Sequence, residues 1–272
     1  MENRTDLALE SYESSDKTKL NGVIVKENDG VTVVEVVNST GAKALSKPVG
    51  KYITCTLPSL VNDTDMFDGR LDKSADLLRT LLPENVSSVL VAGIGNLSIT
   101  ADALGPKSND YVLATRHIMN DNNMKALGSL FNVSSVTTGV LGNTGIESAE
   151  IVRGVAERIK PSCVIAIDAL PASSPDRLGN TLQLSDTGIA PGSGVGNHRY
   201  EISEKTLGIP VISIGIPTVI SASVMSENNE PMFVTPREID RVISQGAKLI
   251  GMTINVCLQK NLSAKDLFSL VG

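Results

Sequence analysis

Two aspartates stand where an α/β protein could use a carboxylate in catalysis. Asp168 ends the apolar run VIAID (164–168), and a carboxylate buried there is costly unless it is paired or opens into a cleft. Asp102 lies in the segment GIGNLSITADALGP (93–106), directly before an expected helix. Two carboxylates that lie close together can divide the acid and base roles in amide hydrolysis. The other interpretation is structural, with each aspartate serving as a helix cap or turn residue.

The glycine-rich segment SDTGIAPGSGVGN (185–197) offers a third candidate site. Its glycines would let backbone N–H groups approach a ligand closely, although they could equally serve a strained turn. They are Gly188, Gly192, Gly194 and Gly196. The tripeptide that begins at Asp186 resembles the pepsin motif, but pepsin-like chemistry needs two such loops in an all-β fold. A single loop in an α/β chain therefore does not support that chemistry.

Other catalytic systems and nucleotide motifs fit the sequence less well. The chain has only two histidines, and no GxSxG motif surrounds a candidate serine. His117 lies on an expected helix and reads as a core or surface residue, whereas His198 beside Arg199 could contact a substrate. The first glycine-rich turn is a poor dinucleotide fingerprint because Ser98 stands where the third glycine belongs, and no P-loop is present.

Composition limits the class of protein. The 272 residues carry a net charge of −6, which argues against direct binding to nucleic acid. No apolar run approaches the roughly 18 residues of a membrane span, and the polar N-terminus does not resemble a secretory signal. The cysteines form no CxxC pair and indicate buried thiols in a reducing cytosol. They are Cys55, Cys163 and Cys257.

Apolar strands that alternate with helices predict a single α/β domain, with a mostly parallel twisted sheet flanked by helices and an antiparallel hairpin near the N-terminus. Residues 1–20 are expected to form a flexible arm or short pro-segment, and residues 21–272 the domain. The strands are expected at 22–27, 31–37, 51–57, 86–96, 133–139, 163–170, 181–185 and 210–216. The helices are expected at 73–82, 106–120, 144–160 and from Thr235 onward, with capping boxes at Thr144/Glu147 and Thr235/Glu238. In such sheets, sites lie beyond the carboxyl ends of the strands.

Seven motifs in order along the chain resemble those of the germination proteases of spore-forming bacteria. They are RTDLALE (4–10), GIGNLSITADALGP (93–106), TRH (115–117), GNTGIESAEIVRG (142–154), KPSCVIAIDALPA (160–172), SDTGIAPGSGVGN (185–197) and GIPVISIGIPTVI (208–220). The resemblance implies a homotetrameric, atypical aspartic-type endopeptidase that needs no cofactor. It also implies that the enzyme cuts small acid-soluble spore proteins in the cytoplasm of the germinating spore, without itself binding nucleic acid or membrane.

The resemblance also assigns residues to roles. It implies that Asp102 and Asp168 are the catalytic pair, with the order of acid and base left open. It implies autoprocessing between Asp6 and Leu7, which would release a six-residue pro-segment that inhibits only weakly. The residues expected to support substrate binding are Asp186, Gly192, Gly194, Asn197 and Arg199.

Two alternatives remain open at this point. The GIGN turn followed by an acidic residue and Gly-Pro is also similar to hydrogenase maturation peptidases, which use carboxylates and a histidine around nickel. No histidine of this chain has an obvious place as such a ligand. The other alternative is a non-catalytic nucleotide- or phosphate-binding protein that uses the loop 192–196.

Overall fold

The computed structural model describes residues 5–16, 20–62, 65–119, 130–190, 200–221 and 232–271. Within these ranges the strands form one nine-stranded sheet in the order β1-β2-β3-β7-β8-β6-β4-β5, and β9 pairs with β8. The strands are β1 (Val23–Asn28), β2 (Val31–Val36), β3 (Gly50–Thr56), β4 (Ser88–Ile94), β5 (Asn132–Gly139), β6 (Cys163–Ala172), β7 (Thr181–Ser185), β8 (Val211–Ser221) and β9 (Phe233–Val234).

The sheet is mixed around a parallel core. Strands β8, β6, β4 and β5 run parallel, whereas β1, β2, β3 and β7 pair in antiparallel fashion, and β7 joins the two parts by pairing antiparallel to β8. The predicted α/β sheet with a parallel core and an N-terminal hairpin is therefore confirmed. The antiparallel part is larger than the hairpin alone, because β3 and β7 extend it.

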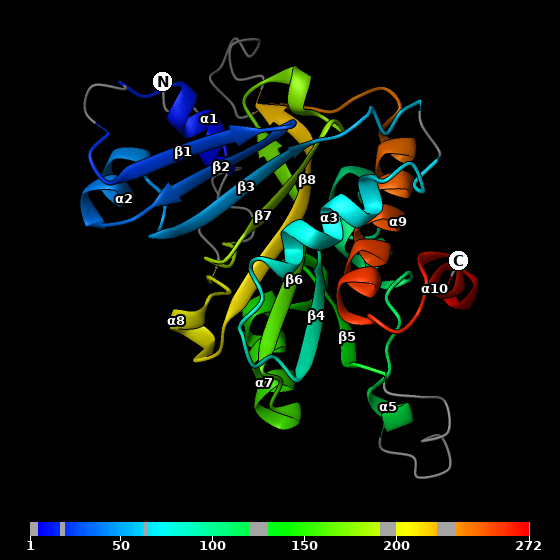
Figure 1. The fold of residues 1–272 in the computed structure, drawn as a ribbon. Coiled ribbons are helices and arrows are strands. Elements are labelled where there is room, and N and C mark those ends of the chain that lie inside the picture. Colours follow the sequence, from blue (N-terminus) through cyan, green and yellow to red (C-terminus); the bar gives the residue numbers. More distant parts are fainter. Residues whose placement is uncertain are drawn as a thin grey trace.

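Helices cover both faces of the sheet, as Figure 1 shows. The long helix α9 and its neighbours α3, α4 and α10 pack on one face, and α1, α2 and α7 pack on the other. The helices are α1 (Ala8–Glu13), α2 (Ser39–Leu45), α3 (Arg70–Arg79), α4 (Leu104–Asn109), α5 (Arg116–Met119), α6 (Leu141–Thr144), α7 (Ser148–Ile159), α8 (Glu204–Leu207), α9 (Ile239–Leu258) and α10 (Ala264–Val271). Short 3-10 helices are η2 (Thr100–Asp102) and η4 (Pro175–Arg177).

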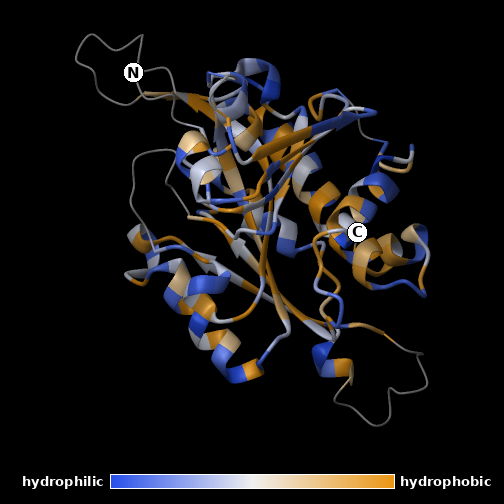
Figure 2. Cartoon of the chain, turned by 60° about the vertical axis from the view of Figure 1, so that its left-hand side comes forward, coloured by the Kyte–Doolittle hydropathy of each residue, from blue (hydrophilic) through white to orange (hydrophobic). Residues whose placement is uncertain are grey.

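Strand periodicity explains how the sheet can be apolar on both faces. Alternate residues of β6 point to opposite sides, so Ile165 and Ile167 join the core under α9 while Val164 and Ala166 meet α7. Figure 2 shows the result, with apolar strands inside and helices whose polar sides face outward. A sheet covered on both faces needs such continuous apolar runs, which is why these strands stand out in the sequence.

One helix prediction is wrong in extent. The expected helix 106–120 is two short helices, α4 and α5, separated by residues 110–115. Tertiary hydrogen bonds take up backbone N–H groups that a continuous helix would use. The Leu113 N–H donates to Asn255 Oδ1, and the Thr115 N–H donates to the carbonyl of Val133. Neither partner is near in the sequence, so periodicity alone could not predict the break.

The expected helix 144–160 also divides, and both predicted capping boxes are wrong. Gly145, with φ of 71°, ends α6, and α7 begins only at Ser148. The N-H of Glu147 donates to the carboxylate of Glu150 instead of pairing with Thr144. Helix α9 begins at Ile239, so Thr235 lies before the helix instead of capping it.

The three cysteines are buried and form no disulfide, as the sequence predicts. Burial raises the pKa of the thiols of Cys163 and Cys257 to about 12, because a thiolate would be poorly solvated there. Among the described helices, none is long and apolar enough to cross a membrane.

Candidate active site

A cleft of about 340 Å³ lies over the middle of the sheet. On this face α1 and α2 cover β2 and α7 covers β4 and β6, and the residues that β7 and β8 place between them are small or polar. Because neighbouring strands are in register, these residues form the floor of the cleft together with Leu170 of β6. They are Gln183, Ser185, Ser213 and Gly215.

Asp168 lies on β6 beside this floor. Its Cα pairs with that of Gly215, and its side chain lies on the same face of the sheet as those of Ala166 and Leu170, which is the cleft face. The residue is only 5% exposed, and its Oδ1 accepts a hydrogen bond of 2.8 Å from the N–H of Ala169. A Cβ at position 215 would collide with the carbonyl oxygen of Asp168, so glycine is required for this close pairing.

Asp102 follows β4 and sits in the 3-10 helix η2. Its Oδ2 accepts a 2.8 Å hydrogen bond from the N–H of Asn96, which closes the glycine turn at the end of the strand. Gly95 adopts φ of 132°, and a side chain there would collide with the carbonyl oxygen of Asp102. The half-buried carboxylate is thus bound to the turn that follows β4. It does not cap the N-terminus of α4, for which no side-chain cap hydrogen bond is formed among the described residues.

Both aspartates therefore come from segments that meet at one edge of the parallel core. Strands β4 and β6 are adjacent and parallel, and the carboxyl end of β4 lies beside Ile167, the residue before Asp168 in the middle of β6. Gly105, three residues after Asp102, packs against the carbonyl oxygens of Ile94 at the end of β4 and of Ile167 in β6. The hydroxyl of Thr218 donates a 2.8 Å hydrogen bond to the carbonyl of Ala101 and ties η2 to β8.

The segment that contains Asp6 and Leu7 forms one wall of the cleft. The Asp6 N–H donates to the carbonyl of Pro171, just beyond Asp168 on β6, and Leu7 is buried against Leu170. Helix α1 follows, so this part of the expected N-terminal arm packs on the sheet. The cleft is thus lined both by the segment with the expected processing bond and by β6, the strand that carries Asp168, although the two are far apart in the sequence.

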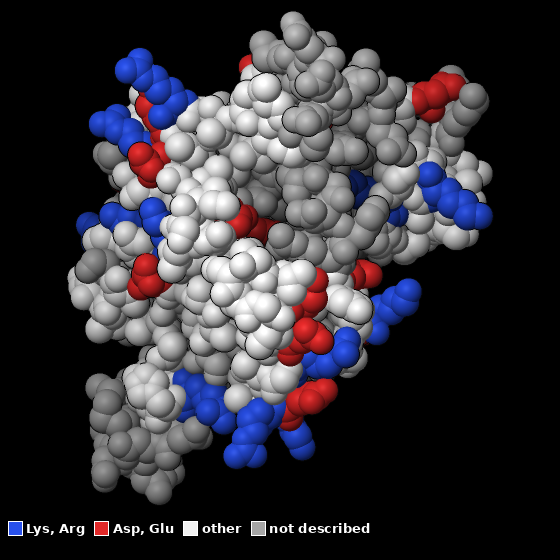
Figure 3. All heavy atoms as spheres, turned by 180° about the vertical axis from the view of Figure 1, so that it is seen from behind, with Lys and Arg blue, Asp and Glu red and all other residues white. Residues whose placement is uncertain are grey.

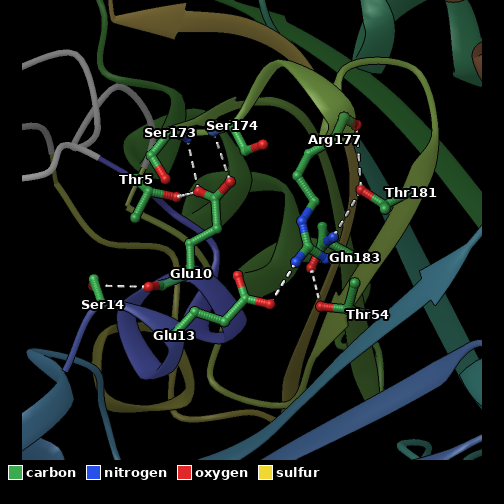
Figure 4. A network of polar contacts seen from close by, with 10 residues as sticks. All are labelled: Thr5, Glu10, Glu13, Ser14, Thr54, Ser173, Ser174, Arg177, Thr181 and Gln183. Carbon is green, nitrogen blue, oxygen red and sulfur yellow. Dashed lines mark hydrogen bonds and ion pairs between the residues drawn. The ribbon is translucent and has the colours of Figure 1, made fainter. Parts of the chain in front are cut away.

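A polar network holds the N-terminal segment in this place (Figure 4). The buried carboxylate of Glu10 accepts hydrogen bonds from the N–H groups of Ser173 and Ser174, at 2.8 and 3.0 Å, and from the hydroxyl of Thr5. The same Thr5 oxygen accepts the N–H of Leu7. The backbone on both sides of Asp6 is therefore fixed by side chains that come later in the chain.

The other predicted site residues are not gathered in the same way. The exposed Asp186 accepts the N–H of Lys51 at 2.7 Å, a contact that joins β7 to β3. His117 is exposed on α5 and does not line the cleft. Several predicted residues lie outside the described ranges, and the phosphate-binding alternative depends on two of them. They are Gly192, Gly194, Asn197, His198 and Arg199.

The structure adds cleft residues that no sequence pattern indicated. Tyr52 of β3 lines the cleft, its hydroxyl donates to the carbonyl of Pro48, and burial raises its pKa to about 12. Gln183 of β7 is held by the hydroxyl of Thr54 at 2.8 Å. Lys47, in the loop after α2, reaches the wall formed by the N-terminal segment. Tyrosine, glutamine and lysine are all common at protein surfaces, so residue type alone did not mark these three as site residues.

The face of the molecule opposite to the view of Figure 1 has acidic side chains recessed in a central hollow (Figure 3). Charged residues that line the described cleft are Asp6, Lys47 and Glu201. In the described part of the chain, no group of three or more His, Cys, Asp or Glu residues is arranged to hold a metal ion. The chemistry available from these side chains is therefore that of carboxylates, hydroxyls and one ammonium group.

A carboxylate that follows one parallel strand and a buried carboxylate on its neighbour, near an open cleft, define an α/β protein with the layout of an enzyme. A family model described as germination protease matches residues 2–230. This chain belongs to the germination protease family, which is a family of endopeptidases.

Curated relatives agree with this assignment. A germination protease of Caldanaerobacter subterraneus is 36% identical over 316 aligned positions, which cover 98% of each chain. One from Clostridium perfringens is 35% identical over 320 positions and 97% of each chain. One from Priestia megaterium is 42% identical over 235 positions, which cover 80% of this chain and 64% of that protein.

A solved structure with partial likeness is that of the [NiFe] hydrogenase maturation protease HycI from Thermococcus kodakarensis. It is 17% identical, and the match covers 66% of this chain and 99% of that one with a TM-score of 0.39. A likeness of this extent supports no conclusion about function.

Proposed function

We propose that this protein is a sequence-specific endopeptidase that cleaves small acid-soluble spore proteins during germination, with Asp102 and Asp168 as its acid–base pair. The observation that carries the proposal is the position of Asp168, which is buried on β6 beside the floor of a cleft, where it pairs with the floor residue Gly215 and lies next to the carboxyl end of β4. Membership of an endopeptidase family supports the reaction class.

The proposed mechanism uses the two carboxylates at different stages of one hydrolysis. One carboxylate accepts a proton from water as the water oxygen attacks the peptide carbonyl carbon. The other, protonated at that moment, gives its proton to the leaving amine nitrogen as the C–N bond breaks. The contacts on Asp102 and Asp168 differ, but both carboxylates accept a backbone N–H, so either order remains compatible with the proposal.

We also propose that residues 1–20 form an N-terminal segment, of which the first six residues are removed by processing, and that residues 21–272 form the peptidase domain. The proposed processing bond joins Asp6 to Leu7, which line the cleft on the side of β6. In this proposal the mature enzyme is a homotetramer in the spore cytoplasm and needs no cofactor. Asp186 and the residues of the loop 191–199 support substrate binding.

The proposal is tested by incubating the purified chain with a small acid-soluble spore protein and identifying the products by mass spectrometry. Asp102→Asn and Asp168→Asn should each lower kcat by about 10²- to 10⁴-fold, the usual contribution of an acid or base group. Asp110→Asn, at an exposed aspartate at the end of α4, is the matched control and should cut at the wild-type rate. Full activity in either site variant, with an unchanged melting temperature, would contradict the mechanism.

A further inference from the structure

The half-buried side chain of Lys47 binds the backbone of the N-terminal segment. Its Nζ donates hydrogen bonds to the carbonyl oxygen of Asp6 at 2.9 Å and to that of Thr5 at 3.2 Å. These residues are 41 and 42 positions earlier in the chain. The carbonyl of Asp6 belongs to the peptide bond between Asp6 and Leu7, so a cation is in contact with the carbonyl oxygen of the bond proposed to be processed.

We propose that Lys47 is a further catalytic residue, whose ammonium group binds the carbonyl oxygen before the cleaved bond and stabilises the negative charge that develops on it. This inference rests on the proposed function, since it assigns a role in the same hydrolysis. Donors fixed at such an oxygen act in the transition state without reorganisation, which makes them among the larger contributions to catalysis.

The carbonyl is fixed on both sides, as such a role requires. The Asp6 N–H is bound to the carbonyl of Pro171, and Leu7 is 2% exposed in its pocket beside Leu170. The oxygen of Asp6 therefore has little freedom to leave the ammonium of Lys47. Hydrogen bonds that the N–H groups of Ser173 and Ser174 donate to the carboxylate of Glu10 hold the following helix in the same position.

The surroundings of Lys47 are also consistent with a functional cation. Burial lowers the pKa of its ammonium group, and the nearby charges of Asp6 and Glu10 oppose this effect. A lysine whose only task was solubility would keep its charge in water. Here the ammonium group donates to two neutral carbonyl oxygens, those of Thr5 and Asp6.

The chemical step balances without any change in the protonation of Lys47. Water gives a proton to the catalytic base and its oxygen adds to the Asp6 carbonyl carbon, and the carbonyl oxygen takes up negative charge while Lys47 donates its hydrogen bond. The carbonyl re-forms as the C–N bond breaks, and the nitrogen of Leu7 leaves as an amine with a proton from the catalytic acid. Once residues 1–6 have left, Lys47 still lines the cleft and can bind the equivalent carbonyl of a spore protein substrate.

The test uses the full-length chain and follows both the appearance of a new N-terminus at Leu7 and the cleavage of a spore protein. Lys47→Met keeps most of the side-chain length without the charge and should lower kcat by about 10²-fold, with a smaller change in KM. Lys43→Met, at an exposed lysine of α2, is the control and should react at the wild-type rate.

A chemical rescue separates catalysis from a merely structural role. Lys47→Cys treated with bromoethylamine regains an ammonium group on a side chain of nearly lysine length. The native cysteines are buried, so the new thiol is modified selectively. Comparing treated and untreated portions of one preparation removes differences in folding, and treatment should restore most of the lost kcat.

Each outcome decides the matter. A loss of kcat in Lys47→Met together with recovery of Lys47→Cys on treatment supports the proposal. Wild-type kcat in Lys47→Met, a change confined to KM, or failure of the treated protein to recover overturns the role of Lys47 and leaves the proposed function intact. Absence of cutting by the wild-type and Lys43→Met chains would instead overturn the proposed function, and the role of Lys47 with it.

Discussion

Replacement of Glu10 by glutamine should loosen the N-terminal helix from the sheet while keeping the size and shape of the side chain. The carboxylate of Glu10 is only 3% exposed and accepts the N–H groups of Ser173 and Ser174, one on each oxygen (Figure 4). Thr5 donates to the oxygen that Ser173 also contacts. In Glu10→Gln, one of those oxygens becomes an NH₂ group, so one backbone N–H faces a donor.

The magnitude follows from these contacts. A buried N–H that loses its acceptor costs about 1 to 3 kcal/mol, and here the lost bond was also to a charged group. A middle value of about 2 kcal/mol corresponds to a roughly 30-fold increase in the population in which the helix is undocked. The matched variant Glu13→Gln breaks the contact of Glu13 with Arg177 at 2.7 Å, but the Glu13 side chain is 51% exposed. Its expected cost is no more than about 0.5 kcal/mol, or roughly twofold.

Hydrogen–deuterium exchange with mass spectrometry measures this difference directly. The N–H groups of Ser11 and Ser14 are bonded to Leu7 and Glu10 carbonyls within the helix, so their exchange reports its opening. Glu10→Gln should accelerate exchange in the peptide covering residues 7–14 by about the stated factor, and should also slow processing after Asp6. Equal exchange in Glu10→Gln and Glu13→Gln would refute the reasoning, because the buried carboxylate would then hold the segment no better than the exposed one.

Two further predictions concern stability. Gly215→Ala should lower the free energy of unfolding by about 1 to 3 kcal/mol, because its Cβ would collide with the carbonyl oxygen of Asp168. Gly154→Ala on α7 is the control, because the space around Gly154 is open, and it should be neutral or stabilising in the same thermal melts. The guanidinium of Arg70 lowers the pKa of Asp68 to about 2, so the stabilisation that Asp68 provides is present above its unfolded pKa and is lost as the pH falls towards 2. Denaturant titrations should therefore find wild type more stable than Asp68→Asn at pH 6, with a difference that shrinks below pH 4 and vanishes as the pH falls through about 2. A pH-independent difference would contradict this.

Local patterns predicted the strands well because a buried strand is defined by its own residues. The hairpin of β1 and β2, the strand β7 and the core of β6 agree with their expected ranges to within a few residues. Each carries the apolar and β-branched residues that pack on a pleated surface. The position of Asp168 at the end of the apolar part of β6 could be read for the same reason, since a carboxylate interrupts such a run visibly.

Helix ends were predicted less accurately because they depend on distant partners. The break after α4 depends on Asn255 and Val133, which satisfy N–H groups that a continuous helix would have used. The start of α7 depends on Gly145, which ends α6, and on the capping pair Glu147/Glu150, which replaces the expected pair Thr144/Glu147. Equivalent capping residues occur at several neighbouring positions, so spacing alone did not select between them.

The sequence by itself determined the α/β class, the strands, the two candidate aspartates and, through its motifs, the family. Tertiary structure alone decided where the cleft lies, because the cleft is the part of one sheet face that α1, α2 and α7 leave open. It also brought Lys47 to Asp6 and the Glu10 carboxylate to Ser173. The physical reason is that periodicity records which side of an element is buried, whereas a contact between residues 41 or 163 positions apart arises only when the packed sheet fixes both partners in space.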